Sequence, residues 1–240
     1  ADSAITLANT GAKVATLNVA GDKAVAITTA AAFNSIKTVN AASNTGGVTF
    51  DESGKTADNQ LTFTGGSGND KVVFKAAYLT AGTSGDVLDG GAGTDTLTIN
   101  DTAPVYAAIN AAKNFEVLGL NTTGATVDVA QLTSINSFAV GSGNLTETFN
   151  NAKSTSTFAI NNTASNTGTV TINNAVGETA TKVTIDNQAG SAQALAALAF
   201  SGISTIELNS TGQVGGSNAI ANITNADKPN GITRPGEVVK

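Results

Sequence analysis

Apolar and polar residues alternate along many short segments of the chain, and Gly or Asn bounds each segment. The clearest alternations span residues 61–63, 96–99, 169–172 and 182–185, which are rich in Val, Ile, Leu, Phe and Thr. A period of two in β-branched residues, interrupted by turn residues, predicts short β-strands. Two Ala-rich segments, residues 103–114 and 191–200, are the best candidates for helical turns. The pattern therefore predicts an all-β chain with little helix.

A second pattern groups apolar residues at successive spacings of three, three and two. A spacing of three places side chains on one side of a tight turn, and a spacing of two places them on one face of a strand. A turn that leads into a short strand is a unit that stacks into a solenoid. We therefore predict a parallel β-solenoid or β-roll; the alternative is ordinary core strands that align by chance. The copies are Leu132, Ile135, Phe138 and Val140; Phe200, Ile203, Ile206 and Leu208; Ile109, Ala112, Phe115 and Val117; and, more weakly, Ala30, Phe33, Ile36 and Thr38.

The residue types that the chain lacks restrict its chemistry. Its 240 residues include no Cys, His, Met or Trp, and the net charge is −6. Without His and Cys there is no Ser-His-Asp triad, thiol nucleophile or zinc site of the Cys type. Oxygen ligands remain, and these suit Ca²⁺ and Mg²⁺. An anionic chain with a single Arg is also a poor candidate for binding nucleic acid, and no apolar run is long enough for membrane insertion.

One motif carries specific chemistry. Residues 65–73 and residues 90–98 both fit G-G-x-G-x-D-x-U-x at every fixed position, and residues 82–89 form a broken copy. The glycines allow the turn to curl and to aim its carbonyl groups at one point, and Asp70 and Asp95 add carboxylates. We expect these two turns to bind Ca²⁺ between them, with Asp86 and Asp89 as less certain ligands. The complete set of candidate metal residues is Gly65, Gly66, Ser67, Gly68, Asp70, Asp86, Asp89, Gly90, Gly91, Ala92, Gly93 and Asp95.

This segment resembles the nonapeptide β-roll of RTX proteins, which are calcium-binding exported proteins of Gram-negative bacteria. The resemblance implies that the turns at 65–70 and 90–95 lie on one side and share an ion, while residues 82–86 lie on the opposite edge. It also implies an extracellular protein exported by type I secretion. One departure is the spacing, because Gly65 and Gly90 are 25 residues apart, whereas two nonapeptides span about 18. The extra residues, 75–81, must bulge or widen the coil, and about one to three ions are expected.

The rest of the chain resembles calcium-dependent surface-layer proteins of Gram-negative bacteria. The resemblance is carried by strands rich in Thr, Ala and Asn, by the absence of Cys, and by residues 115–118 and 206–208. It implies a structural protein on the bacterial cell surface that assembles with copies of itself, with cell-surface polysaccharide as a further candidate partner. The chain starts with Ala1, so a fragment or a processed product is expected. We divide it into N-terminal β coils (1–64), the RTX-type segment (65–101) and C-terminal solenoid repeats (102–240), which together form one continuous unit.

Other functions remain open at this stage. An adhesin or ice-binding module would use Thr-x-Thr pairs, but these pairs start at residues 62, 96, 155 and 169, and no fixed coil length explains such intervals. An enzyme of the polysaccharide-acting β-helix type is less favoured, because the only Arg, Arg234, lies in an expected tail. The adjacent carboxylates Asp51 and Glu52 should point to opposite faces of a strand. We interpret Asp101, Asp128 and Asp186 as turn or surface residues, with an additional ion site as the alternative.

Overall fold

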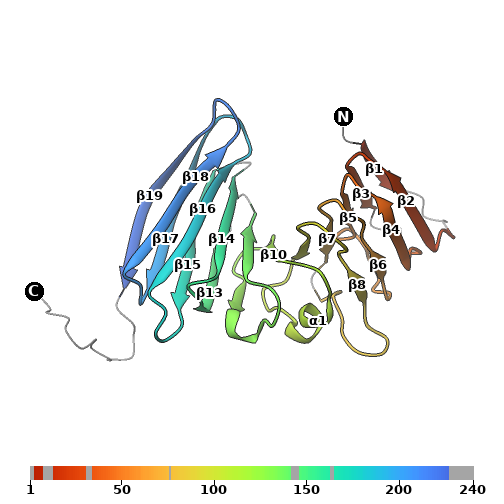
Figure 1. The fold of residues 1–240 in the computed structure, drawn as a ribbon, viewed down its shortest axis with the longest axis horizontal. Coiled ribbons are helices and arrows are strands. Elements are labelled where there is room, and N and C mark those ends of the chain that lie inside the picture. Colours follow the sequence, from red (N-terminus) through yellow and green to blue (C-terminus); the bar gives the residue numbers. More distant parts are fainter. Residues whose placement is uncertain are drawn as a thin grey trace, which may run out of the picture.

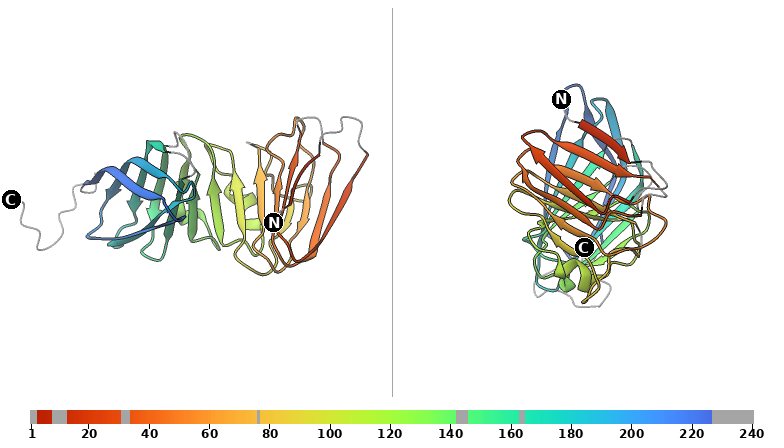
Figure 2. Two further views of the ribbon diagram at one scale, coloured as in Figure 1. Left: turned by 90° about the horizontal axis from the view of Figure 1, so that it is seen from above. Right: turned by 90° about the vertical axis from the view of Figure 1, so that its right-hand side faces the viewer.

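A computed structural model describes residues 3–7, 13–30, 34–75, 77–141, 146–162 and 165–226. These residues form an elongated, bent stack of strands in which the two ends rise as arms from a middle that contains β10 and α1 (Figure 1). Views from above and from one end show the same stack (Figure 2). The described residues are all-β apart from one short α-helix and one 3₁₀ turn, as predicted.

The strands form three parallel sheets, which we call the long sheet, the N-terminal sheet and the C-terminal sheet. The long sheet contains β1 (Ser3–Leu7), β3 (Val25–Thr29), β5 (Val48–Asp51), β7 (Lys71–Phe74), β9 (Thr96–Ile99), β10 (Val117–Leu120), β12 (Ser137–Val140), β14 (Thr157–Asn162), β16 (Ala180–Asn187) and β18 (Thr205–Gly212), in that order. The N-terminal sheet contains β2 (Thr16–Gly21), β4 (Thr38–Asn44), β6 (Thr62–Thr64) and β8 (Val87–Asp89). The C-terminal sheet contains β11 (Thr126–Asp128), β13 (Glu147–Ala152), β15 (Asn166–Asn174), β17 (Ala192–Ser201) and β19 (Ser217–Ala226).

Each coil of the solenoid adds one strand to the long sheet. Opposite that strand the coil places a strand of the N-terminal or C-terminal sheet or, between β9 and β10, the helix α1 (Tyr106–Ala111). Partners in the long sheet are 20 residues apart at Ser137↔Thr157 and 25 residues apart at Lys71↔Thr96 and Lys182↔Glu207. The register therefore places equivalent residues of successive coils on top of one another. The parallel β-solenoid predicted from the sequence is confirmed, and the coil that contains the two glycine-rich turns is wider than a pair of nonapeptides.

The core consists of inward-facing apolar columns that run through the stack. Phe138, Phe149 and Phe158 meet in the second half of the molecule, with ring centroids 4.9 to 5.2 Å apart. Burying aromatic rings in contact contributes more than burial of their area alone. One column of the long sheet is fully buried along its length and comprises Ile27, Phe50, Val72, Leu97, Leu118, Phe138, Phe158 and Val183.

The two helix predictions have different outcomes. Helix α1 (Tyr106–Ala111) lies inside the expected segment 103–114, and a 3₁₀ turn, η1 (Val129–Gln131), follows β11. The second prediction is wrong, because residues 192–201 form strand β17 between β15 and β19. Its Leu195, Leu198 and Phe200 are buried against the core, so pairing and packing override the helix preference of Ala.

Three copies of the apolar repeat cover turns that lead into strands of the long sheet, although the register offsets their residues, and the weak copy leads into β4 of the N-terminal sheet. Leu132 and Ile135 precede β12 and are buried together with Phe138 and Val140. The copy from Ile109 to Phe115 is buried in the same way before β10, whereas Leu208 in the last copy is 41% exposed. Phe33 of the weak copy lies outside the described residues.

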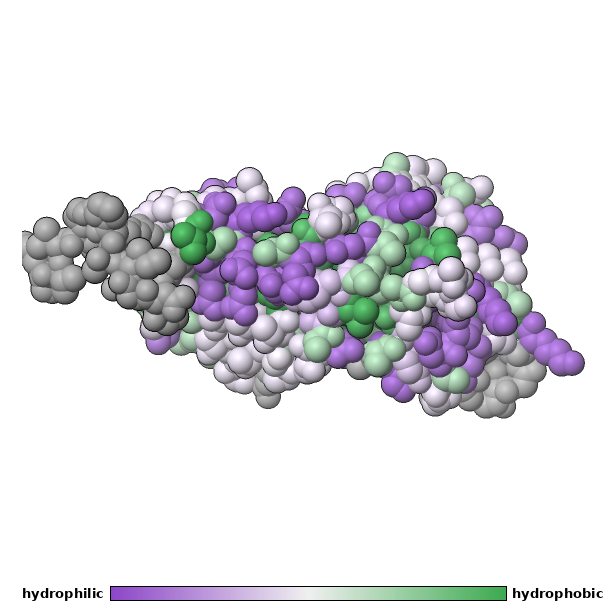
Figure 3. Space-filling view, turned by 90° about the horizontal axis from the view of Figure 1, so that it is seen from below, coloured by the Kyte–Doolittle hydropathy of each residue, from purple (hydrophilic) through white to green (hydrophobic). Residues whose placement is uncertain are grey.

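Both hydrophilic and hydrophobic residues lie on the surface. On the face seen from below, hydrophilic residues are interspersed with small hydrophobic patches along the length of the molecule (Figure 3). Within the described ranges, none of the helices has the length and apolar character needed to cross a membrane.

Candidate metal centre

The two complete glycine motifs form stacked turns at one corner of the solenoid. Residues 65–70 connect β6 to β7, and residues 90–95 connect β8 to β9, one coil further on. The Gly65 amide donates to the Asp89 carbonyl over 2.8 Å, and the Ala92 amide donates to the Gly66 carbonyl over 2.9 Å. We call this pair of turns, with the neighbouring turns at 44–47 and 113–116, the glycine corner. The structure thus brings the two motifs into direct contact.

Glycine is required at this corner because the backbones of successive coils touch. A Cβ atom on Gly65 would lie 1.9 Å from the Gly90 carbonyl oxygen, and one on Gly66 would lie 1.9 Å from the Asn44 carbonyl oxygen. A Cβ atom on Gly90 would lie 2.1 Å from the Asn114 carbonyl oxygen. These distances leave no room for a side chain. Ser67, Gly93 and Ala92 lie further out in the same turns, where Ser67 and Ala92 are exposed.

A row of carboxylates links the coils at the glycine corner. Asp70 Oδ1 accepts a hydrogen bond from the Val48 amide over 2.5 Å, and Asp95 Oδ1 accepts one from the Asp70 amide over 2.6 Å. Glu116 Oε2 continues the series by accepting from the Asp95 amide over 2.8 Å. We call Asp70, Asp95 and Glu116 the carboxylate ladder. Each member satisfies a backbone donor of the preceding coil, so the motif aspartates have a structural role of their own.

The second oxygens of Asp70 and Asp95 differ. Asp70 Oδ2 accepts from the Gly66 amide over 2.7 Å. The equivalent amide in the next coil, that of Gly91, donates to Asp89 Oδ1 over 3.1 Å instead. Asp95 Oδ2 is therefore buried with no hydrogen-bond partner among the described residues. An unpaired carboxylate oxygen in a buried site is costly unless it is protonated or bound to a cation.

The raised pKa of Asp95 also favours protonation or a bound cation at this carboxylate. Burial is the main cause that raises the pKa of Asp95 to about 6, and the neighbouring Asp70, Glu116 and Asp89 carboxylates raise the pKa further. Burial also raises the pKa of Asp70, although its two backbone hydrogen bonds oppose the shift. The corner therefore concentrates negative charge that a divalent cation would neutralise.

Asp89 and Asp86, the two aspartates of the broken copy, occupy different places. Asp89 lies at the glycine corner, where Asn114 Nδ2 donates to Asp89 Oδ1 over 2.7 Å. Asp86 lies at the opposite end of β8, where its carboxylate accepts from the amides of Leu61 and Thr80, each over 2.8 Å. The structure thus brings Asp89 to the stacked turns and leaves Asp86 at the other edge.

Glu116 and Asn114 belong to the corner but were missed in the sequence. Their turn lacks the glycine motif, so a search for that motif passes over it. The apolar repeat does not identify them, because it aligns Val117 with Val140, whereas the observed register pairs Val117 with Ser137 and with Thr96. Glu116 then falls at the position of Asp95.

The donor set is only a partial match to a calcium site. In the part of the chain that the structure describes, no three acidic side chains converge on one point. Ca²⁺ takes about six to eight oxygen ligands, so backbone carbonyls of the turns would have to supply most of them. Asp95 Oδ2, which is buried and without a partner, is the atom that fits such an ion best.

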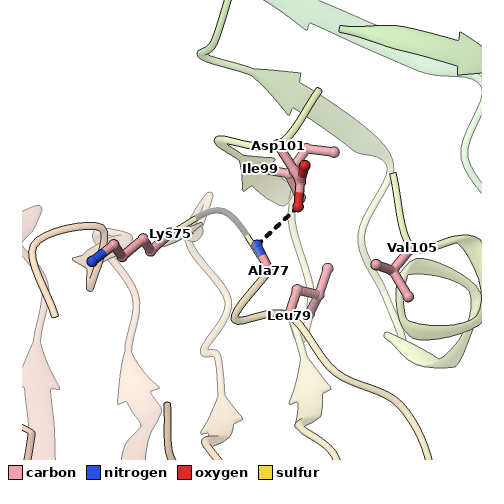
Figure 4. Close-up of a pocket in the computed structure, with 6 residues that line it drawn as sticks. All are labelled: Lys75, Ala77, Leu79, Ile99, Asp101 and Val105. Carbon is pink, nitrogen blue, oxygen red and sulfur yellow. Dashed lines mark hydrogen bonds between the residues drawn. The ribbon is translucent and has the colours of Figure 1, made fainter. Parts of the chain in front are cut away.

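The other acidic residues singled out in the sequence have structural partners. Asp101 Oδ2 accepts from the Ala77 amide over 2.8 Å in a small pocket between the loop after β7 and α1, lined by Lys75, Ala77, Leu79, Ile99, Asp101 and Val105 (Figure 4). Asp128 accepts from the Ala130 amide and from Asn151, and Asp186 accepts from Thr211.

The adjacent carboxylates Asp51 and Glu52 make different contacts. Asp51 accepts from the Ser53 amide over 2.9 Å, whereas Glu52 is buried against Lys55. Among the candidate sites from the sequence, the glycine corner is thus the one with a buried carboxylate oxygen, Asp95 Oδ2, that lacks a partner.

Comparisons of the chain with known protein families, with curated proteins and with solved structures find no match.

Proposed function

We propose that this protein is a structural, calcium-dependent component of an extracellular bacterial surface layer in which copies assemble with one another. The observation that carries the proposal is the glycine corner, where two complete G-G-x-G-x-D turns stack and leave Asp95 Oδ2 buried without a partner. The resemblance of these turns to RTX repeats supports calcium over other cations. Calcium is abundant outside cells, which favours export by type I secretion.

Calcium would act at the corner as an additional link between coils. Asp95 would hold the ion together with turn carbonyls. The negative charges of Asp89 and Asp70 are near enough to raise the pKa of Asp95. Binding a divalent cation would offset this repulsion and would couple ion binding to folding of the stacked turns. The ion would therefore stiffen the N-terminal half of the solenoid.

A structural role is supported by the shape and surface of the molecule. A continuous long sheet runs from β1 to β18 and offers extended faces for contacts between copies. The adhesin or ice-binding alternative requires a flat array of Thr pairs. The pairs that begin at Thr62, Thr96 and Thr169 lie on the N-terminal, long and C-terminal sheets respectively, and Thr98 is buried. Cell-surface polysaccharide remains a proposed second partner. Arg234 of the enzyme alternative lies outside the described residues.

The site is tested by calorimetric titration of calcium into the protein and its Asp95→Asn variant. The Asn side chain keeps an oxygen that can accept from the Asp70 amide, so the turn is expected to fold. We expect calcium affinity to fall by about tenfold or more, a loss of about 1.4 kcal/mol. Asp128→Asn is the matched control and should leave affinity unchanged, because Asp128 lies on β11, away from the corner. Unchanged affinity in Asp95→Asn, or no binding in millimolar calcium, would reject the site.

Assembly is tested separately by electron microscopy. We expect ordered two-dimensional arrays in millimolar calcium and their loss on chelation. Arrays that survive chelation unchanged would contradict the calcium dependence, and the absence of arrays would contradict the lattice and favour the adhesin.

A further inference from the structure

The two complete motif turns, the first at 65–70 and the second at 90–95, share a sequence pattern but not their hydrogen bonds. In the first turn both carboxylate oxygens of Asp70 accept from backbone amides. In the second turn Asp95 is fully buried, and its Oδ2 has no partner among the described residues. Of these two turns, the second therefore is the one that leaves a buried carboxylate oxygen for an ion.

The residue that precedes each motif explains this difference. Thr64 precedes the first motif, and Asp89 precedes the second. Asp89 Oδ1 accepts from the Gly91 amide over 3.1 Å, whereas the equivalent Gly66 amide of the first turn donates to the motif aspartate. Gly91 has a φ of +93°, which glycine adopts without strain, and Gly66 does not have a positive φ. Asp89 thus binds the amide that would otherwise close the second turn.

The next coil brings another oxygen to the same place. A Cβ atom on Gly90 would lie 2.7 Å from Asp95 Oδ2 and 2.1 Å from the Asn114 carbonyl oxygen, so both oxygens lie beside the Gly90 Cα. Asn114 has a φ of +54°, which is uncommon for a residue with a side chain, and its Nδ2 donates to Asp89 Oδ1 over 2.7 Å. A buried carboxylate oxygen beside a carbonyl oxygen favours a cation or a proton between them.

We infer that the metal ion lies between the second motif turn and the turn at 113–116, and that the first motif turn is a metal-independent link between coils. Asp95 Oδ2 and the Asn114 carbonyl oxygen are ligands, and other turn carbonyls complete the set. Asp89 is a positioning residue, because it frees the Asp95 oxygen and holds Asn114. The resemblance to RTX repeats implies instead an ion between the two motif turns. This inference rests on the proposed calcium function and assigns the place of its ion.

Manganese titration followed by NMR tests where the ion lies. Mn²⁺ takes the same oxygen ligands as Ca²⁺, and its unpaired electrons broaden the signals of nearby amides. At substoichiometric Mn²⁺ we expect the amides of residues 113–116 to broaden several-fold more than those of residues 65–70, and excess calcium should reverse the broadening. Equal broadening of the two turns, or stronger broadening at 65–70, would place the ion between the motif turns and overturn the inference.

Two substitutions of Asp89 test its positioning role by calorimetric titration of calcium. Asp89→Thr gives the second motif the residue that precedes the first, so the Gly91 amide should turn to Asp95, and affinity should fall by about tenfold or more. Asp89→Asn keeps an oxygen that can accept from Gly91 and Asn114, so affinity should stay within about threefold of the parent. Asp22→Asn removes an exposed carboxylate and controls for the lost charge. An equal loss in both Asp89 variants would contradict the positioning role.

The outcomes separate this inference from the proposed function. A protein that binds no calcium, and whose amides Mn²⁺ does not broaden, contradicts the proposed calcium site itself and means that Asp95 holds a proton. A protein that binds calcium but shows broadening centred on the first motif turn contradicts the inference alone. The manganese measurement uses the unmodified protein, so it decides the position of the ion even if a variant fails to fold.

Discussion

The two arms of the solenoid share one backbone plan but are held together by different interactions. In the N-terminal arm, β1 to β9, carboxylates link successive coils at the glycine corner. In the C-terminal arm, β12 to β19, aromatic packing and neutral polar groups contribute much of the contact between coils, and the Lys182–Glu207 ion pair is exposed. The comparison teaches that one parallel scaffold can link its coils by buried carboxylates in one half and mainly by packing in the other.

Aromatic packing and neutral polar contacts are prominent in the C-terminal arm, where the Lys182–Glu207 ion pair is exposed. Its core contains the contacts among Phe138, Phe149 and Phe158. On its surface, Asn173 donates to Asn150 over 2.9 Å and accepts from Ser201 over 2.8 Å, which connects β13, β15 and β17. These contacts should not respond to calcium.

The N-terminal arm contains more buried charge. Besides the carboxylate ladder, Glu52 and Lys55 form an ion pair in which both side chains are almost completely buried. Burial raises the pKa of Glu52 to about 7, even though Lys55 opposes the shift. Breaking such a pair would leave an uncompensated charge in the interior. The arm should therefore be the more sensitive half to solution conditions.

The largest expected effect tests the packing of the C-terminal arm. Phe158→Ala removes a buried ring from the aromatic contacts, and we expect a loss of about 3–5 kcal/mol in the free energy of unfolding. Urea unfolding measures the loss, and calcium should not restore it. Phe158→Leu is the control, with a smaller loss because it keeps most of the volume. If calcium restored the Ala variant, the proposed independence of the two arms would be wrong.

The next effect concerns an exception within the C-terminal arm. Glu147 is fully buried in β13, and neither of its carboxylate oxygens has a hydrogen-bond partner among the described residues. Burial raises the pKa of Glu147 from 4.5 to about 7. The folded protein then keeps a proton that the unfolded chain releases, so the contribution of Glu147 to stability is greatest below about pH 4.5 and is lost as pH rises through about 7.

Glu147→Gln should remove that part of the pH dependence. At pH 8 the variant should be more stable than the parent by up to about 3 kcal/mol, since one pKa unit corresponds to about 1.4 kcal/mol. Urea unfolding at pH 5 and pH 8, at fixed calcium, measures the difference. Glu178→Gln is the control, because the Glu178 carboxylate accepts from Ser154, which lowers its pKa, so the variant should give no gain at pH 8. A Gln variant that loses as much stability as the parent between pH 5 and 8 would assign the pH dependence to Glu52 and the N-terminal arm.

The smallest expected effect tests the neutral surface contacts. Asn173→Ala removes one hydrogen bond to Asn150 and one from Ser201, and we expect a loss of about 1 kcal/mol because the site is partly exposed. The loss should be the same with calcium and with chelator. Thermal unfolding under both conditions provides the measurement, and a calcium-dependent loss would show that the arms are coupled.

Much of the fold can be predicted from the sequence, but less of the glycine corner can. Alternation and the apolar repeat identify the coils, because each coil must bury its own inward side chains, as Ile135 and Phe138 do. Helical turns are expected over residues 191–200 because Ala favours a helix locally, but pairing with β15 and β19 makes residues 192–201 a strand. The stacking of the glycine turns follows from their motif, but Glu116 and the burial of Glu147 depend on register between distant residues, which local patterns do not specify.

The glycines of this chain form two populations that composition alone cannot separate. At Gly65, Gly66 and Gly90 a methyl group would collide with the backbone of a neighbouring coil, whereas Gly82 and Gly177 have no atom within 4 Å of that position. In a lineage of descendants, the first group should stay fixed because every substitution forces coils apart. The second group is constrained by its backbone instead, because Gly82 and Gly177 have φ values of +103° and +89°, which residues with a side chain rarely adopt. The same residue type thus meets a packing constraint at one edge of the solenoid and a conformational constraint in its exposed turns.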